Sequence, residues 1–260
     1  MDNIVLKQCV EQDAELRQVF CGFLLEDDVH NILGGSTGQS SDRRMNRLRL
    51  FLANTMLSRG IEQFPIAFFL NTGTHVNGGV HWQALYVDHN HMAYFFDSYG
   101  RRPNKAFNAF AHEMITISYY REYMCRASMK QALSDDEFTR DALRRCYTTK
   151  VANDQPDTCR YFPYQIQSDI TNVCGEYSLI FLHNIARCAT PWMHGYDYFT
   201  HYPDAFYLIP GRVASTERHE NAKKRLPYNQ RKKLLNNDEL IRKIVLQLYT
   251  GIHLPSSILE

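Results

Sequence analysis

Residues 66 to 97, IAFFLNTGTHVNGGVHWQALYVDHNHMAYFFD, give the strongest indication of the fold of this chain. The run Ile66–Leu70 is short and wholly apolar, which is typical of a buried strand. Two further apolar runs, 81–87 and 92–97, flank the polar turn 88–91 and predict a hairpin at the centre of a sheet.

Segments with a helical spacing of apolar residues surround this region. We expect helices at 4–24, 44–58, 105–124, 134–146, 174–187 and 238–249, a bent or edge strand at 160–166, and a basic, loop-rich stretch at 212–233. The long helical region between the strands favours one interwoven α+β domain over residues 1 to 260. Its expected parts are a helical N-terminal part (1–60), a core (65–188), and a basic segment with a C-terminal helix (212–260).

Composition is that of an ordinary globular protein, with 44% hydrophobic and 22% charged residues and a net charge of +1. No apolar run reaches membrane-spanning length, and the first residues lack the pattern of a secretory signal, so we expect an intracellular protein. Cysteine occurs 7 times, without a CxxC pair. Such spacing favours neither a disulfide framework nor a zinc site, and we predict no metal.

The residue types needed to activate a thiol occur in this chain in a suggestive order. Cys174 opens the most apolar helical segment, and a helix N-terminus lowers the pKa of a thiol. His81, at the start of one hairpin strand, is the candidate base. Asp97, at the end of the next strand, lies where it would hold the second ring nitrogen of that base.

Three further residues support the same interpretation. Gln167 has a side-chain amide that suits an oxyanion hole, with the N–H of Cys174 as the second donor. Trp82 is expected to pack over the site and restrict the imidazole, and Gly175 to leave room for substrate beside the sulfur. Taken singly, each residue more often has a structural role, such as a core cysteine or a turn-forming aspartate. Their combination favours nucleophilic catalysis.

Several segments resemble those of the adenain family of adenovirus maturation proteases and the related SUMO proteases. Residues 71–82 share internal spacing with the histidine segment, 95–100 resemble the apolar-apolar-acid-x-aromatic-Gly element, and 167–175 the Gln…Cys-Gly segment. The resemblance implies His81 as base, Asp97 as its partner, Cys174 as nucleophile and Gln167 in the oxyanion hole. It also implies a papain-like cysteine-peptidase fold, in which helices flank a central mixed sheet and the His-Asp-Cys order is permuted.

The implied reaction is cleavage of peptide bonds after Gly-Gly or Gly-x-Gly-like sites through a thioester. The implied setting is processing of viral or virus-like structural precursors in the host cytoplasm or nucleus, or in the virion. The adenovirus enzymes carry Glu at the position of Asp97, where the SUMO proteases carry Asp. This chain is also longer, so we expect a relative from another DNA virus or a virus-derived element.

The resemblance further implies two activators, a viral peptide disulfide-bonded to an enzyme cysteine and DNA. Cys159 is the candidate cysteine, although its spacing to Cys174 is shorter than in the family, and a buried or edge thiol is the favoured alternative. Candidate contacts to nucleic acid are Lys223, Lys224, Arg225, Arg231, Lys232 and Lys233. A solvated loop and helix start is the commoner explanation of such charges.

Three alternatives to a processing endopeptidase stay open. An isopeptidase that removes ubiquitin-like modifiers would use the same residues and the same narrow groove. An acetyltransferase of the same clan would need an acyl-CoA site, and no phosphate-binding Gly-rich loop is evident. A non-catalytic binding module would have had no need to keep His81, Asp97, Gln167 and Cys174 together.

Overall fold

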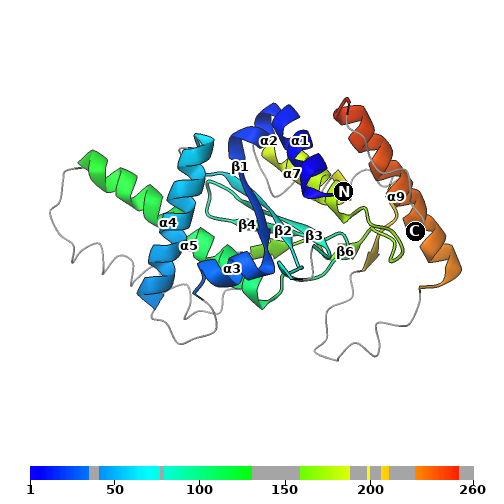
Figure 1. Cartoon of the computed structure of the whole chain (residues 1–260), viewed down its shortest axis with the longest axis horizontal. Helices are drawn as coiled ribbons and strands as arrows, with labels where there is room; N and C mark the ends of the chain where they lie inside the picture. The colour runs from blue at the N-terminus through cyan, green and yellow to red at the C-terminus, as the bar shows by residue number, and fades with distance from the viewer. Residues whose placement is uncertain are drawn as a thin grey trace.

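A mixed five-stranded sheet in the order β1-β2-β3-β4-β5 forms the middle of the molecule (Figure 1). Its strands are β1 (Phe20–Leu25), β2 (Ile66–Asn71), β3 (Trp82–Val87), β4 (Ala93–Phe96) and β5 (Cys159–Tyr161). The outer pairs β1/β2 and β4/β5 are parallel, whereas β2/β3 and β3/β4 are antiparallel. The expected hairpin is therefore confirmed, with β3 as the central strand.

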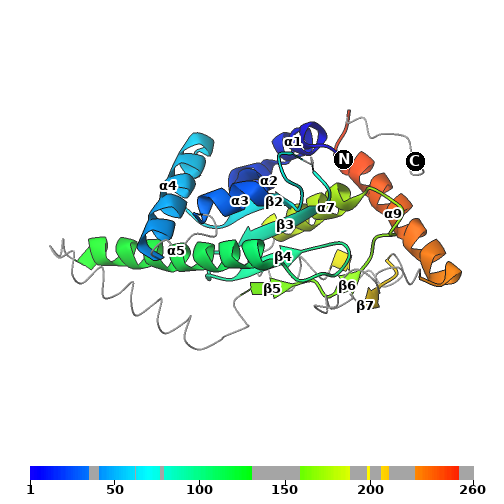
Figure 2. The same cartoon turned by 60° about the horizontal axis from the view of Figure 1, so that its bottom comes forward.

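The computed structural model describes residues 1–34, 41–61, 63–76, 79–130, 159–187, 198–199, 206–210 and 226–251, with the backbone alone at 41–46 and 119–130. Its helices are α1 (Asn3–Gln12), α2 (Ala14–Val19), α3 (Glu26–Ile32), α4 (Ser41–Arg59), α5 (Lys105–Lys130), α7 (Cys174–Ala186) and α9 (Tyr228–Leu248). A second small sheet pairs β6 (Tyr164–Gln165) with β7 (Ile209–Pro210). Figure 2 shows β2 to β5 side by side, with β6 and β7 beyond the end of β4.

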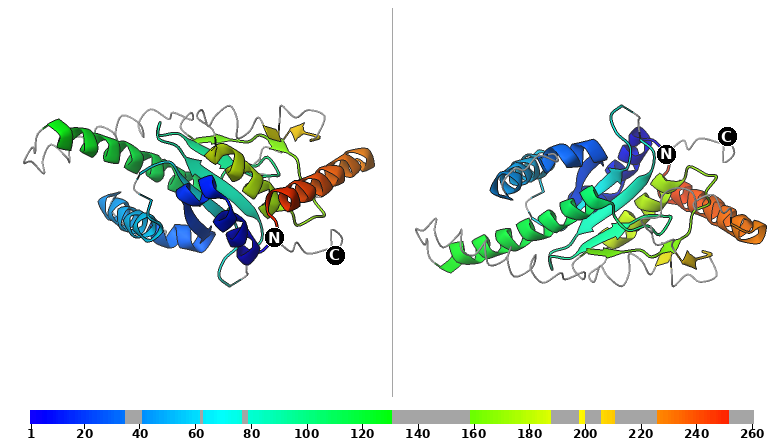
Figure 3. Two further views of the ribbon diagram at one scale, coloured as in Figure 1. Left: turned by 90° about the horizontal axis from the view of Figure 1, so that it is seen from above. Right: turned by 90° about the horizontal axis from the view of Figure 1, so that it is seen from below.

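Helices cover both faces of the sheet, because strand side chains alternate between the faces and both sets are apolar. In β2, Ala67 and Phe69 join the core formed with α1, α2, α7 and α9, whereas Phe68 and Leu70 join the core formed with α3, α4 and α5. Figure 3 shows the α7 side from above and the α5 side from below. The protein is thus α+β, with a mixed sheet flanked by helices, as expected.

The expectation of one helix over 4–24 is wrong. Asp13 ends α1 and accepts a hydrogen bond from Leu16 N–H at 3.0 Å to begin α2, so the helical part is already broken there. Residues from Phe20 onward form β1, which pairs with β2. Aromatic residues spaced three apart fit either structure, and pairing with a buried parallel strand favours the extended one.

The expected loop at 228–233 is also wrong, because α9 begins at Tyr228 and runs ten residues further toward the N-terminus than predicted. Its buried positions follow helical spacing: Leu234, Asn237, Asp238, Ile241 and Val245. Two of these, Asn237 and Asp238, are polar. A search for regularly spaced apolar residues therefore did not reveal the buried face of this helix. The predicted strand at 160–166 is divided into β5 and β6 around Pro163, and the predicted helix at 134–146 lies outside the described residues.

A buried ionic cluster joins the start of α2 to the far end of α7. Asp13 accepts hydrogen bonds from His183 Nδ1 at 2.6 Å, Arg187 Nη2 at 2.8 Å and the Tyr249 hydroxyl at 2.9 Å. Burial by itself would raise the pKa of Asp13, but the bonds from His183 and Arg187 lower it well below its usual range.

Within the described residues, no helix has the length and apolar character needed to cross a bilayer.

Candidate active site

His81 and Asp97 meet just beyond the paired ends of β3 and β4. The register sets Ala84 opposite Phe96, so the residues that precede β3 and follow β4 lie at one end of the hairpin. Nε2 of His81 lies 2.9 Å from Oδ1 of Asp97. His81 is only 6% exposed and Asp97 is fully buried, so water competes little for this interaction.

Two further donors hold the Asp97 carboxylate. Gln83 Nε2 donates to Oδ2 at 2.6 Å, and the N–H of Tyr99 donates to Oδ1 at 2.8 Å. Burial would raise the pKa of Asp97, but the charge and hydrogen bond of His81 together with these donors lower it. Asp97 is therefore a carboxylate whose orientation is fixed on both oxygens.

The imidazole of His81 is stabilised as a cation. Burial opposes the charged form, but the nearby Asp97 carboxylate and a hydrogen bond with Cys174 raise the pKa of His81 to about 9. The ring of Tyr99 stacks on the imidazole, with centroids 4.8 Å apart and planes inclined by 29°. This contact leaves the ring little freedom to rotate.

Cys174 brings its sulfur to this pair from α7. It is the first residue of the helix, and the first intrahelical bond is donated by Tyr177 N–H to Val173 O at 3.2 Å. The amides of residues 174–176 therefore have no backbone acceptor within the helix. The N–H of Trp82 donates to Sγ at 3.3 Å. With Nε2 of His81 bonded to Asp97, Nδ1 is the ring nitrogen left for the sulfur.

The side chain of Asn71 forms hydrogen bonds with the backbone of the segment that leads into His81. Its Oδ1 accepts hydrogen bonds from Gly73 N and Val80 N, both at 2.9 Å, and from His81 N at 3.3 Å. Gly79 is required beside it, because a Cβ there would lie 2.7 Å from Nδ2 of Asn71. Asn71 thus fixes the backbone on which the candidate base is carried.

Gln167 is held on both ends of its side-chain amide. The hydroxyl of Ser98, next to Asp97 in the chain, donates to Oε1 at 2.6 Å, and Nε2 donates to Thr171 O at 2.7 Å. These two bonds define which end of the amide is nitrogen. The second N–H of Nε2 remains for another acceptor. The amide is therefore an oriented donor beside the residue that follows Asp97.

Trp82 differs from its expected role. Its ring packs edge-on against Phe23 and Phe69, at centroid distances of 5.8 and 6.1 Å, and its Nε1 donates to Met1 O at 3.1 Å. The ring that stacks on His81 is Tyr99, because Trp82 is the first residue of β3 and turns its side chain toward the α7 core.

The space beside Gly175 is narrow, since a Cβ there would lie 3.1 Å from Cβ of Met1 and 3.4 Å from Trp82 Cδ1. Gly175 therefore allows the N-terminal residue and the indole to approach the start of α7. The expected room for substrate at this glycine is occupied by Met1 and Trp82.

The remaining predicted residues lie apart from this site or outside the described residues. Cys159 is half-buried in β5, and burial raises the pKa of its thiol to about 12, which fits the favoured alternative of an edge thiol. Lys232 and Lys233 are exposed on α9, and Lys233 lies over the ring of Tyr207 at 4.5 Å. Arg231 is half-buried on the same helix, and 223–225 are not among the described residues.

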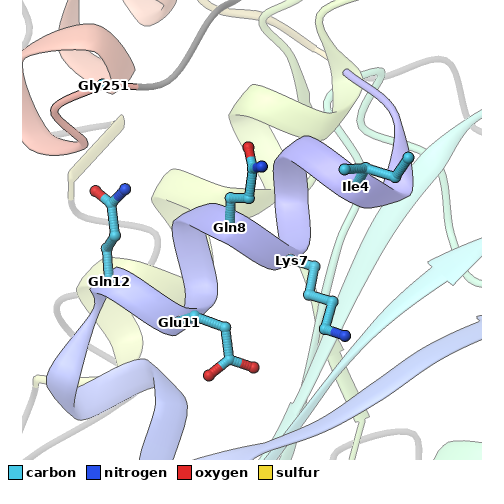
Figure 4. A pocket seen from close by; sticks show the side chains of 6 residues that line it. All are labelled: Ile4, Lys7, Gln8, Glu11, Gln12 and Gly251. Carbon is cyan, nitrogen blue, oxygen red and sulfur yellow. The ribbon is translucent and has the colours of Figure 1, made fainter.

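A separate hollow of about 550 Å³ lies along α1 (Figure 4). Figure 4 shows its lining residues, which are Ile4, Lys7, Gln8, Glu11, Gln12 and Gly251. It shares no residue with the His81 site.

Among the described residues, no three His, Cys, Asp or Glu side chains gather in a group that could hold a metal ion.

Sequence reasoning missed Gln83, Tyr99 and Asn71, although each left a signal. Gln83 is two residues from His81 on an otherwise apolar strand, so period-two alternation sets the two on one face. Tyr99 follows Asp97 by two residues. Asn71 ends a wholly buried strand and is itself only 1% exposed, which calls for hydrogen-bond partners.

The described arrangement places a thiol at a helix N-terminus beside an imidazole that is stabilised as a cation. Sγ faces the N–H of Trp82 and the ring of His81, and a buried carboxylate fixes that ring. Such a pair is nucleophilic toward carbonyl carbon and carries a proton for a leaving group. Comparison of the sequence with known protein families and with curated proteins finds no match.

Proposed function

We propose that this protein is a cysteine endopeptidase in which Cys174 is the nucleophile, His81 the acid and base, and Asp97 its orienting partner. The observation that carries the proposal is the continuous hydrogen-bonded series from Asp97 through His81 to Cys174, buried at a helix N-terminus. The raised pKa of His81, about 9, supports a thiolate–imidazolium pair at neutral pH.

In the first half of the reaction, Sγ of Cys174 attacks the peptide carbonyl carbon, and the π electrons move to the oxygen. The N–H of Cys174 and the free N–H of Gln167 are the proposed donors to that oxyanion. The C–N bond then breaks as Nδ1–H of His81 protonates the leaving amine, which leaves a thioester. In the second half, His81 takes a proton from water, the hydroxide adds to the thioester carbon, and the C–S bond breaks.

The proposed substrate class rests on the resemblance of residues 71–82, 95–100 and 167–175 to the adenain family. We propose cleavage after Gly-Gly or Gly-x-Gly sequences in viral or virus-like precursor proteins, on a papain-like fold with permuted catalytic order. A viral peptide at Cys159 and DNA on the basic residues 223–225 and 231–233 remain proposals for activation.

The test is cleavage of Gly-Gly-x and Gly-x-Gly-x peptides beside ubiquitin and SUMO conjugates. Wild type is expected to cleave the peptides, and Cys174→Ala and His81→Ala to lose at least about a thousandfold in kcat/KM. Mass spectrometry after rapid acid quench should find the acyl group on Cys174. Equal activity of wild type and Cys174→Ala would refute the proposal, and cleavage of conjugates alone would establish the isopeptidase instead.

A further inference from the structure

The loop between β6 and α7, which carries Gln167, is bonded to the C-terminal helix. Asp238 of α9 accepts from Ser168 N at 3.1 Å, from Thr171 Oγ1 at 2.7 Å and from the Tyr177 hydroxyl at 3.0 Å. Asp238 is fully buried. A carboxylate without water is stable only when such donors satisfy it, so the loop and the helix are mutually dependent here.

Asn237, the preceding residue, holds the other side of the same loop. Its Nδ2 donates to Ile166 O at 2.9 Å and to Tyr207 O at 2.7 Å, and its Oδ1 accepts from Tyr207 N at 2.8 Å. It is 2% exposed. Two adjacent polar residues on α9 therefore bond to the residues on either side of Gln167, Ile166 and Ser168.

Thr171 connects this contact directly to the Gln167 amide. Its hydroxyl donates to Asp238, while its carbonyl accepts from Nε2 of Gln167 at 2.7 Å. The bond to Asp238 therefore helps to hold in place the residue whose carbonyl orients the amide. Ser98, which follows β4, donates to Oε1 at the opposite end of the amide at 2.6 Å. The direction of the remaining N–H of Nε2 is therefore set by the bonds to Ser98 and to Thr171.

We propose that Asn237 and Asp238 are positioning residues, which set the Gln167 amide for oxyanion binding through the loop 166–171. The proposal rests on the proposed peptidase function, because an oxyanion arises only during acyl transfer. It makes α9 part of the catalytic apparatus, although no residue of that helix touches the reacting atoms. Catalysis then depends on the integrity of the C-terminal helix.

The electrostatics of Asp238 support a pH-dependent contribution. Burial raises the pKa of Asp238 to about 7, and its hydrogen-bond donors only partly oppose that. The titratable groups that face it are Glu176 and Tyr177 of α7, with the Ser168 amide and Thr171 hydroxyl from the loop. The ionised carboxylate accepts the hydrogen bonds from Ser168, Thr171 and Tyr177 together. The contact between α9 and the loop 166–171 is therefore complete only above about pH 7.

The test compares wild type with Asp238→Asn, which keeps the shape, and Thr171→Val, which removes only the hydroxyl. Both should lower kcat on a Gly-Gly-x peptide by about tenfold with KM within twofold, because transition-state binding alone is weakened. The rate of Cys174 alkylation by iodoacetamide should stay within about twofold. Amide exchange at Ser168 should accelerate, and Asp238→Asn should lose the acid limb near pH 7.

Glu239→Gln, which removes a carboxylate exposed on the same helix, is the matched control and should behave as wild type. An unchanged kcat in Asp238→Asn, or an equal fall in kcat and alkylation rate, would overturn the proposal. If wild type cleaves no peptide, the peptidase proposal fails on its own. Exchange at Ser168 then decides separately whether Asp238 holds the loop, and unchanged exchange would refute that as well.

Discussion

Asp97 lies 2.9 Å from His81, and their side chains are 0% and 7% exposed. Because this contact raises the pKa of His81, replacing Asp97 by Asn should shift the alkaline limb of activity below its wild-type position near pH 9. The same change should lower kcat by roughly a hundredfold, since a neutral amide at position 97 cannot stabilise the imidazolium and the orienting charge is lost.

The measurement is a pH profile of kcat between pH 6 and 10 for both proteins. Gln83→Glu is a useful companion, because it keeps a side chain of similar size at the second Asp97 oxygen but adds a negative charge. An Asp97→Asn enzyme with an unmoved alkaline limb would show that another group governs it.

Thiol reactivity should distinguish Cys174 from the other described cysteines. Burial raises the pKa of Cys9, Cys21 and Cys159 to about 12, so these thiols are almost wholly protonated at pH 7. With limiting iodoacetamide, the peptide containing Cys174 should be alkylated before those containing Cys9, Cys21 and Cys159, and His81→Ala should remove that preference. Peptide mass spectrometry follows the order of labelling, and earlier labelling of Cys159 would contradict the assignment.

Gly79→Ala should impair both stability and activity through Asn71. The added methyl would lie 2.7 Å from Asn71 Nδ2, so the loop before His81 must shift. Overpacking of this kind costs about 1–3 kcal/mol of unfolding free energy. Val80→Ala, at a neighbouring residue that is 71% exposed, is the control and should be neutral. Urea denaturation measures the effect, and equal stability of both variants would dismiss the steric role of Gly79.

Asp13 should contribute stability at neutral pH that disappears in acid. Its pKa is lowered in the folded protein, so its contribution is complete above the ordinary value of 3.8, begins to fall below it, and is lost only as the pH falls through the much lower folded-state pKa. Asp13→Asn should lower the unfolding free energy at pH 7 by about 3 kcal/mol, the lower end for breaking a buried pair, because Arg187 is partly exposed.

The control is Glu15→Gln, since Glu15 also pairs with Arg187 but its side chain is 53% exposed, and the cost should stay below about 1 kcal/mol. Denaturation at pH 7 and at pH 3 separates the two variants. The penalty for Asp13→Asn should be only partly reduced at pH 3, because the folded-state pKa of Asp13 lies lower still, and a penalty with no reduction at all would mean that packing rather than charge is responsible.

The central hairpin and the pairing of His81 with Asp97 could be predicted because both depend on local signals, whereas the approach of Cys174 was expected from thiol chemistry and from the family resemblance. Apolar runs with a polar turn define β3 and β4, and a hairpin register leaves few places for residues at its open end. Cys174 could be placed because an apolar helix begins at it. The structure brings the three together, while the chemistry proposed for them awaits experiment.

Other features could not be predicted, because they depend on partners distant in the sequence. Asp238 and Asn237 look like surface residues until the loop at 166–171 is docked on them. The strand β1 is specified by β2, with which it pairs, rather than by its own residue pattern. Tyr99 takes the stacking place expected for Trp82, because strand alternation turns the indole toward α7.

The sulfur of Cys174 accepts a hydrogen bond from the backbone amide of Trp82, which lies 92 residues earlier in the chain. During synthesis, the hairpin with its imidazole and carboxylate leaves the ribosome well before the helix that completes the set. An emerging polypeptide therefore lacks the contact between Cys174 and the hairpin until α7 docks on β3. The proposed peptidase activity would then arise only with the finished tertiary structure, and nascent copies could not cut themselves or their neighbours.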